Sequence, residues 1–288
     1  MINKIKILYS TITSTKVTRG SSSFFIFYFC VTHSINIVGK HLPRLADFMR
    51  KSALFFILKT PQRTRVFTIQ NKTGIFEVTP LNDSMTISAD YFEAHLLPWL
   101  DKPRQKRVCI DIGAHMGRYS ILALKHFHYD KVVAIEANPR TFTLLKKNIE
   151  LNTITKKVTL VPIALGNQKG TLEFESNENN LAVAHVVTSR TTLSPRNKVI
   201  QVASDRASEV LRINHVNYKE IDFIKMDVEG FEYQVLDGMK EILEDMQSGS
   251  YVMIEISNPE NRKAQDVLEH HSFSLQLTNG ADYLYVKN

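Results

Sequence analysis

The residues with the clearest chemical potential begin at Asp111, near the end of the apolar stretch Val108–Ile112. Gly113 and Gly117 follow with the spacing Gly-x-x-x-Gly, which differs from the Gly-x-Gly-x-x-Gly turn of a dinucleotide site. Glycine allows a sharp turn and a close approach of the backbone to a ligand. The carboxylate of Asp111 would repel a pyrophosphate and attract a cation. The stretch therefore predicts a strand, a glycine turn and a helix start that hold a cationic ligand; a purely structural turn is the alternative.

A second carboxylate, Glu136, ends the next apolar stretch, Val132–Glu136. An acid in this place can accept hydrogen bonds from both hydroxyls of a ribose. Asn138 and Pro139 suit the N-cap and first turn of a helix, so capping alone is the structural alternative. A ribose beside a cationic sulfonium indicates S-adenosyl-L-methionine as the cofactor. The residues predicted to bind it are Asp111, Gly113, Ala114, His115, Gly117, Tyr119, Glu136, Ala137, Asn138, Ala164, Leu165 and Asp227.

Two more acids, Asp227 and Glu229, follow the apolar stretch Ile221–Met226. A spacing of two along a strand points both side chains the same way, and crowded carboxylates raise each other's proton affinity. We therefore predict Asp227 and Glu229 as catalytic residues that remove a proton from a substrate hydroxyl. Alternatively, they orient cofactor or substrate, hold a divalent cation through oxygen ligands, or form the acidic start of a helix at Glu232–Glu244.

The elements that must position these acids follow from the periodicity of the chain beyond Arg107. Strand-length apolar stretches alternate with helix-period segments, which is typical of a parallel sheet with helices on its faces. A tight apolar loop at Pro162–Gly166 would pack against the adenine ring. A hairpin turning at Asn279-Gly280 ends the chain. The strands of the sheet are expected at Val108–Ile112, Val132–Glu136, Val158–Ile163, Ile221–Met226 and Tyr251–Ile256.

Composition divides the 288 residues into an apolar and basic arm (1–60), a small strand-rich cap (61–107) and a cofactor-binding domain (108–288). Arm and cap together hold 16 basic and 6 acidic residues, whereas the domain holds 20 and 23. The basic arm would meet an anionic partner or form a solvated surface. The strands of the cap are expected at Val66–Ile69, Ile75–Val78 and Met85–Ile87, before a short helix at Tyr91–Leu100.

The arm contains a stretch without Lys, Arg, Asp or Glu, Ser21–Gly39, which is 19 residues long. Polar residues in its second half argue against a spanning helix, whereas a basic amphipathic helix predicted at His41–Lys59 favours peripheral contact with a membrane. The two cysteines, Cys30 and Cys109, have no metal-ligand spacing and indicate no disulfide framework. We therefore expect a cytoplasmic protein without a metal site, with the arm as the part that would contact a membrane.

Taken in order, these residues resemble the FkbM family of methyltransferases over roughly 83–255, with Lys225–Gly230 as the least generic match. The resemblance implies a Rossmann-like class I methyltransferase fold, a three-layer α/β sandwich, and methyl transfer from S-adenosylmethionine. The acceptor in this family is usually a hydroxyl of a sugar or secondary metabolite. The sequence departs from the family pattern at His115, Ala137 and Phe231, and of the segment before the fourth strand only Asp205 matches.

Two other functions compete with this interpretation. The segment Asn148–Asn152, following Asn138-Pro139, is similar to tRNA guanosine methyltransferases, and the arm is basic. However, Asp227 and Glu229 would repel a phosphate backbone, so a small-molecule or glycan acceptor is favoured and no nucleic acid is expected. A non-catalytic protein that has kept the fold is the second competitor, and the presence of Asp111, Gly113 and Glu136 counts against it.

Overall fold

The computed structural model describes residues 15–19, 45, 49, 66–79, 84–177, 180–187, 198–256 and 262–288. Contacts divide the chain into two compact units, residues 1–94 and 95–288. This division lies N-terminal to the boundary expected at residue 107. The uncharged stretch 21–39 lies outside the described residues, as does nearly all of the helix predicted at 41–59. Within the described ranges, no helix has the length and apolar character needed to cross a membrane.

The first unit contains an antiparallel sheet in the order β1-β2-β3. These strands are Lys16–Arg19, Phe67–Gln70 and Ile75–Val78. A turn at Asn71 joins β2 to β3, with the Asn71 carboxamide oxygen accepting from the Thr73 amide at 3.1 Å. The predicted strand at 85–87 is wrong, because Ser84–Ile87 forms the single helical turn α4. So short an apolar stretch does not distinguish a strand from a buried helical turn.

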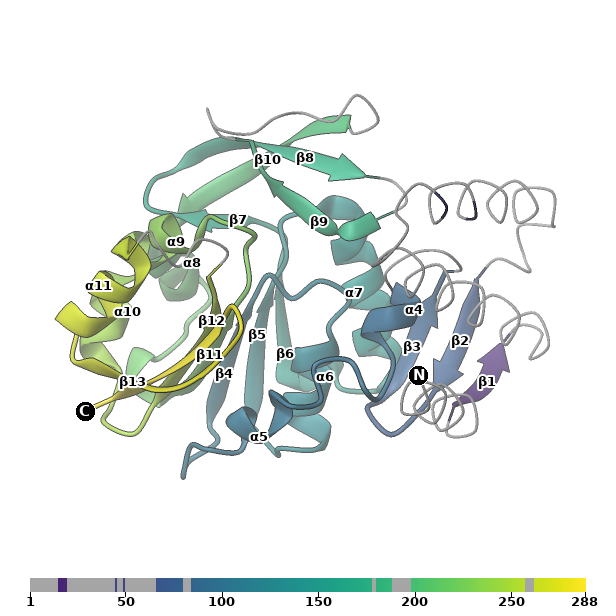
Figure 1. Cartoon of the computed structure of the whole chain (residues 1–288), viewed down its shortest axis with the longest axis horizontal. Coiled ribbons are helices and arrows are strands. Elements are labelled where there is room, and N and C mark those ends of the chain that lie inside the picture. The colour runs from purple at the N-terminus through teal and green to yellow at the C-terminus, as the bar shows by residue number, and fades with distance from the viewer. Residues whose placement is uncertain are drawn as a thin grey trace. The chain divides into compact units, whose positions relative to one another are not determined.

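The second unit is built on a seven-stranded sheet in the order β13-β14-β12-β11-β4-β5-β6 (Figure 1). Every neighbouring pair from β12 to β6 is parallel, and β14 runs antiparallel to both of its neighbours. All five predicted strands and the C-terminal hairpin are present, with ends that differ by at most two residues. The strands are β4 Val108–Ile112, β5 Lys131–Ile135, β6 Val158–Val161, β11 Ile221–Met226, β12 Tyr251–Glu255, β13 Phe273–Asn279 and β14 Asp282–Lys287.

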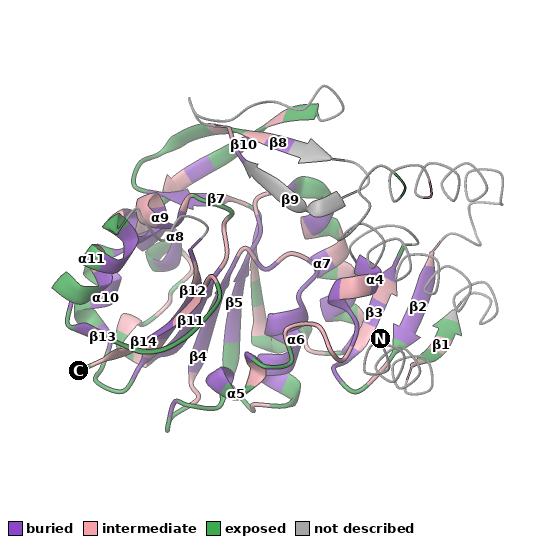
Figure 2. Ribbon diagram, in the orientation of Figure 1, coloured by how far each residue is buried: buried purple, intermediate pink, exposed green. Residues whose placement is uncertain are grey.

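Helices cover both faces of this sheet, with α8 to α11 on one side and α6 and α7 on the other (Figure 1). Apolar side chains from the strands and from α8 to α11 form one continuous core, and Figure 2 shows β4, β5 and β11 buried along most of their length. The predicted α/β three-layer sandwich is therefore confirmed. The helices are α5 Leu97–Leu100, α6 Arg118–Lys125, α7 Pro139–Leu151, α8 Ala207–Ile213, α9 Glu232–Gly238, α10 Lys240–Asp245 and α11 Lys263–His270, with the 3-10 turns η2 Thr155–Lys157 and η3 Tyr218–Glu220.

A second, four-stranded sheet in the order β7-β10-β8-β9 was not predicted. It lies beyond the end of the large sheet at which β4 and β5 finish (Figure 1). The tight loop expected at Pro162–Gly166 is shorter than predicted, because β6 ends at Val161 and Ala164–Gly166 form strand β7. The helix predicted at 232–244 is interrupted at Met239, where φ is −119° and ψ is 18°. The strands are β7 Ala164–Gly166, β8 Gly170–Asn177, β9 Asn180–Val186 and β10 Lys198–Arg206.

An ion pair ties the entry of β4 to the start of β11. Asp222 is 4% exposed and accepts from the Arg107 backbone amide, Nε and Nη2 at 2.7, 3.0 and 2.6 Å. Asp222→Ala is expected to lower the free energy of unfolding by about 2 kcal/mol, because it leaves three donors without this acceptor. Urea unfolding measures this change. Glu209→Ala, which removes the exposed partner of Arg212, is the control; equal effects would contradict the prediction.

Candidate active site

The carboxyl ends of β11, β4 and β5 lie side by side, since these strands are neighbours and parallel. Asp111 is the fourth residue of β4, and Glu136 directly follows β5. The backbone amides of Gly113 and Ala114 both donate to the carbonyl of Ile135, at 3.0 Å each. These bonds attach the glycine turn after β4 to the end of β5. The fold thus brings the two predicted cofactor-binding acids to one edge of the sheet.

Asp111 is a buried acid, 1% exposed. Its Oδ2 accepts from the Ser120 hydroxyl at 2.6 Å, whereas Oδ1 is buried without a hydrogen-bond partner among the described residues. Burial raises the pKa of Asp111, and the ammonium of Lys225 opposes that shift. A buried carboxylate oxygen without a donor is costly. The geometry therefore leaves Asp111 with an acceptor position that a ligand donor can fill.

Glu136 connects the two loops that follow β4 and β5. Its Oε2 accepts from the His115 amide at 2.9 Å, and its Oε1 accepts from the Asn138 amide at 2.8 Å. Burial raises the pKa of Glu136. Asn138 also forms the predicted N-cap, since its side chain accepts from the amide of Arg140 at 3.0 Å. Each oxygen of Glu136 keeps a further lone pair, so capping and ligand binding are compatible here.

Two glycines of the turn have positive φ values and close contacts. Gly113 has a φ of +75°, and a Cβ there would lie 1.9 Å from the carbonyl oxygen of Asp227. Gly117 has a φ of +87°, and a Cβ there would lie 2.6 Å from Cδ1 of Leu145. The amide of Asp227 also donates to the carbonyl of Ile112 at 3.1 Å. Only glycine fits both the conformation and the space in this turn.

Gly113→Ala is expected to lower the free energy of unfolding by at least about 2 kcal/mol, because it adds a backbone clash to a left-handed conformation. Gly249→Ala is a matched control, since Gly249 has a φ of +83° and nothing lies within 4 Å of the added methyl group. Thermal unfolding of both variants separates the clash from the conformational cost. Equal destabilisation by the two substitutions would show that contact with Asp227 is unimportant.

Asp227 and Glu229 follow β11, which ends at Met226, so their side chains do not share the alternation of a strand. Asp227 is half-buried, and its Oδ2 lies 3.2 Å from the ammonium of Lys225. Glu229 is exposed and has a φ of +51°. Within the parts of the chain that the structure describes, no group of three or more His, Cys, Asp or Glu side chains has a geometry that could hold a metal ion.

Two charged residues of this edge were missed by sequence reasoning. Lys225 is 7% exposed, and its Nζ lies 5.2 Å from the centre of the Tyr119 ring. Glu255 is the last residue of β12, next to β11 in the sheet. A signal was available for both: Lys225 interrupts an otherwise apolar stretch, and Glu255 lies near the end of one, as Asp111 does.

The raised pKa of Glu255 should make the stability of the folded protein depend on pH. Burial, followed by the charges of Asp227, Asp282 and Glu229, raises its pKa from 4.5 to about 7, against the opposing effect of Lys225. Between these two values the folded state holds more protons than the unfolded state, so the free energy of unfolding falls as pH rises. Glu255→Gln should flatten this decline between pH 4.5 and 7, as measured by urea unfolding across the range. An unchanged slope would contradict the assignment.

The remaining predicted residues divide between the two sheets. Ala114, Tyr119 and Ala137 lie in or beside the turns that carry Asp111 and Glu136. Ala164 and Leu165 are instead buried in strand β7 of the second sheet, where Leu165 belongs to the core. Asp205 lies in β10 opposite Leu165, and its Oδ1 accepts from the amide of Arg206 at 2.8 Å.

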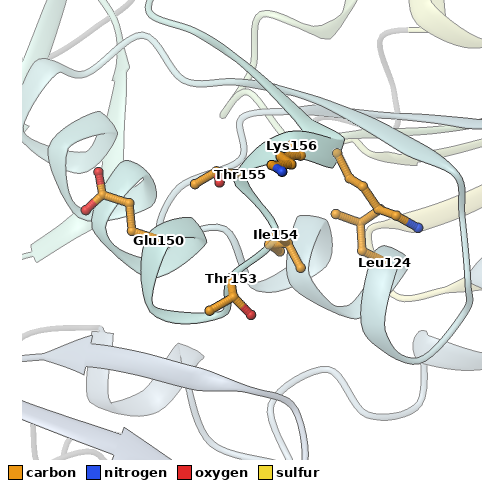
Figure 3. A pocket seen from close by; sticks show the side chains of 7 residues that line it. Leu124, Glu150, Thr153, Ile154, Thr155 and Lys156 are labelled. Carbon is orange, nitrogen blue, oxygen red and sulfur yellow. The ribbon is translucent and has the colours of Figure 1, made fainter.

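A surface hollow of about 680 Å³ lies between the ends of α6 and α7 and the turn η2 (Figure 3). Since η2 leads into the first residue of β6, the hollow is at the amino edge of the sheet, opposite the acids. No predicted site residue lines it. The lining side chains are Leu124, Glu150, Thr153, Ile154, Thr155, Lys156 and Lys157.

Known proteins that are similar to this chain in sequence include methyltransferases. The methyltransferase sdnD of Sordaria araneosa is 26% identical over 155 residues, which cover 46% of this chain and 60% of sdnD. The hexuronic acid methyltransferase AglP of Haloferax volcanii is 24% identical over 215 residues, 74% of this chain and 79% of AglP. The chain thus spans less than two thirds of the length of sdnD.

A solved structure and a family model complete the comparison. The methyltransferase FkbM of Methylobacillus flagellatus aligns with 63% of this chain and 43% of its own, with a TM-score of 0.42 and 14% identity. The model of the methyltransferase FkbM domain matches residues 111–285, from the acid of β4 to the last strand and over more than half of the chain. The chain therefore belongs to the FkbM family of methyltransferases.

Proposed function

We propose that this enzyme binds S-adenosylmethionine at the carboxyl ends of β4 and β5 and transfers its methyl group to a hydroxyl oxygen of a sugar, glycan or secondary metabolite. The observation that carries the proposal is the buried Oδ1 of Asp111, which has no hydrogen-bond donor among the described residues. Asp111 belongs to β4, the strand that leads into one of the two loops held by Glu136. The cofactor supplies a methyl group on a cationic sulfonium, which makes that carbon open to attack by an oxygen.

The residues present fit such a cofactor. Asp111 offers a buried acceptor for a cationic amino group, with which its charge is complementary. Glu136 offers the free lone pairs of a carboxylate to ribose hydroxyls, and its bonds to the amides of His115 and Asn138 hold it in place. Gly113 keeps side-chain atoms out of the turn between them. The neighbours Ala114, Gly117, Tyr119 and Ala137 would complete the cofactor site.

We place the acceptor beside Asp227 and Glu229. Asp227 is fixed by Lys225 and can orient an acceptor hydroxyl, whereas the exposed Glu229 can form hydrogen bonds at the rim. A sugar acceptor is supported by the name of AglP, a hexuronic acid methyltransferase. Four acids, Asp227, Glu229, Glu255 and Asp282, influence this edge electrostatically and disfavour a phosphate backbone. A hydroxyl-rich acceptor that carries no phosphate group suits these charges.

Transfer of a labelled methyl group into a cell extract tests the proposal. The extract is fractionated into small molecules, glycans and RNA after incubation with the enzyme and labelled S-adenosylmethionine. We expect label in the small-molecule or glycan fraction, and a Gly113→Ala enzyme should transfer less of it. Label in RNA, together with salt-dependent RNA binding, would overturn the acceptor class. No calorimetric binding of millimolar S-adenosylmethionine would instead indicate a non-catalytic protein.

A further inference from the structure

We propose that Glu255 is the base that accepts the proton of the acceptor hydroxyl, whereas Asp227 orients the acceptor. This inference rests on the proposed function of the same site. Glu255 ends β12, which is the parallel neighbour of β11. The strand order therefore places Asp111, Asp227 and Glu255 at the ends of three adjacent strands, β4, β11 and β12.

The register of the sheet sets Glu255 between two other acids. Met226 of β11 pairs with Ile254 of β12; Glu255 is the next residue of β12, and Asp227 directly follows the end of β11. On the other side, Glu255 is directly opposite Asp282 of β14. Directly opposite residues of an antiparallel pair have Cβ atoms about 5 Å apart, so Asp282 is close to Glu255. Glu255 is thus flanked by a carboxylate on each side, and Glu229 adds a third at longer range.

Lys225 distinguishes the two candidate bases. Its ammonium forms an ion pair with Asp227 at 3.2 Å, so a proton arriving on Asp227 would break that pair. No ion pair reaches Glu255 from the described residues, and the surrounding acids favour its protonated form. Burial and these charges raise the pKa of Glu255 to about 7. A base works best when its pKa lies near the working pH, and Glu255 meets this condition.

Bonds and protons balance in the proposed methyl transfer. The acceptor oxygen forms a bond to the methyl carbon as the bond between that carbon and sulfur breaks, and the sulfur leaves as a neutral thioether. The hydroxyl proton moves to the Glu255 carboxylate, which later returns it to solvent. No oxidant, reductant or further reactant is needed. The chain's contribution is a half-buried carboxylate next to an acceptor that Asp227 holds.

Proton release on cofactor binding tests this inference without an acceptor. S-adenosylmethionine carries a sulfonium, and a cation near Glu255 would favour the ionised carboxylate. At pH 7 a group with a pKa near 7 is about half protonated, so wild-type protein should release up to roughly half a proton per bound ligand more than Glu255→Gln. Calorimetry in buffers of different ionisation enthalpy measures the difference. Glu150→Gln, an exposed helix residue at the opposite edge, should release as many protons as the wild type.

The outcomes distinguish failure of the proposed function from failure of the role of Glu255 as the base. If wild-type protein does not bind S-adenosylmethionine, the proposed function fails. If it binds but Glu255→Gln releases the same number of protons, only the role of Glu255 is overturned. Asp282→Asn provides a second variant, since removing a flanking charge lowers the pKa of Glu255 and should reduce the release at pH 7.

A rate measurement then separates Glu255 from Asp227, with the extract fraction that accepts label as the acceptor. Glu255→Gln should lower the transfer rate at pH 7 by about 100-fold and abolish the acidic limb of the pH profile. Asp227→Asn should keep that limb while weakening acceptor binding. A Glu255→Gln enzyme with the wild-type rate and limb would overturn the inference.

Discussion

Glu136→Ala is expected to weaken the binding of S-adenosylmethionine by at least about 100-fold, which is the largest effect that the structure predicts for ligand binding. Two hydrogen bonds from ribose hydroxyls to a carboxylate contribute about 1.5 kcal/mol each at the low end, and about 1.4 kcal/mol corresponds to a tenfold change in affinity. The substitution also removes the acceptor of the His115 and Asn138 amides. Both loops of the site therefore lose their common support.

Titration calorimetry measures this change, with two variants for comparison. Glu136→Gln keeps one carbonyl oxygen but turns an NH₂ group toward a backbone donor, so its affinity should fall between those of the wild type and Glu136→Ala. Glu150→Ala, on the exposed side of α7, should bind as the wild type does. An affinity of Glu136→Ala within threefold of the wild type would contradict the assignment of the ribose to Glu136.

Lys225→Met is expected to have the largest effect on stability, a loss of about 3 kcal/mol in the free energy of unfolding at pH 8. The ammonium of Lys225 pairs with Asp227 and opposes the raised pKa values of Asp111, Glu136 and Glu255. Methionine fills a similar volume but leaves these acids without the cation. The loss should be smaller at pH 5, where protonation removes more of their negative charge.

Urea unfolding of both proteins at pH 5 and pH 8 measures this effect. Lys240→Met is the control, because it removes the cation of an ion pair with Asp237 on an exposed helix surface. Its effect should be small and nearly independent of pH. If Lys225→Met were as stable as the wild type at pH 8, Lys225 could not be the cation that balances the acids of this edge.

Periodicity predicted the parts of the fold that have a continuous apolar face. Each of the strands β4, β5, β11 and β12 is an apolar stretch whose burial in a parallel sheet leaves little ambiguity. The placement of Asp111 and Glu136 at one edge of the sheet could be predicted because each lies at or next to the end of such a strand. The close approach of Gly113 to Asp227 could not, because the two are more than a hundred positions apart in the sequence.

The four-stranded sheet was missed because its described strands show no clear period in the sequence. In β10, exposed and buried residues alternate imperfectly, and Ala164–Gly166 has too few residues to show a period. For such short segments, the sequence is equally compatible with a loop and with a strand. Ala164 and Leu165 were predicted in a loop at the adenine ring, and the structure places both in strand β7; their contact with the ring stays a prediction.

The charged residues of the site could not be identified from the sequence for a different reason. Lys225 and Glu255 belong to separate strands, and their significance comes from their neighbours across the sheet: Asp227, Asp282 and Asp111. Strand order and register determine those neighbours, and neither follows from spacing along the chain. The spacing of Asp227 and Glu229 was misleading for the same reason, since β11 ends before both residues and the backbone turns at Glu229.

A crystal structure of the protein with S-adenosylhomocysteine, the demethylated cofactor, tests the central claim most directly. We expect the ribose hydroxyls to contact the carboxylate of Glu136 and the amino group to donate to Oδ1 of Asp111. The sulfur should face the carboxylates of Asp227 and Glu255. A ligand bound elsewhere, for example in the hollow beside Leu124, would contradict the proposed site.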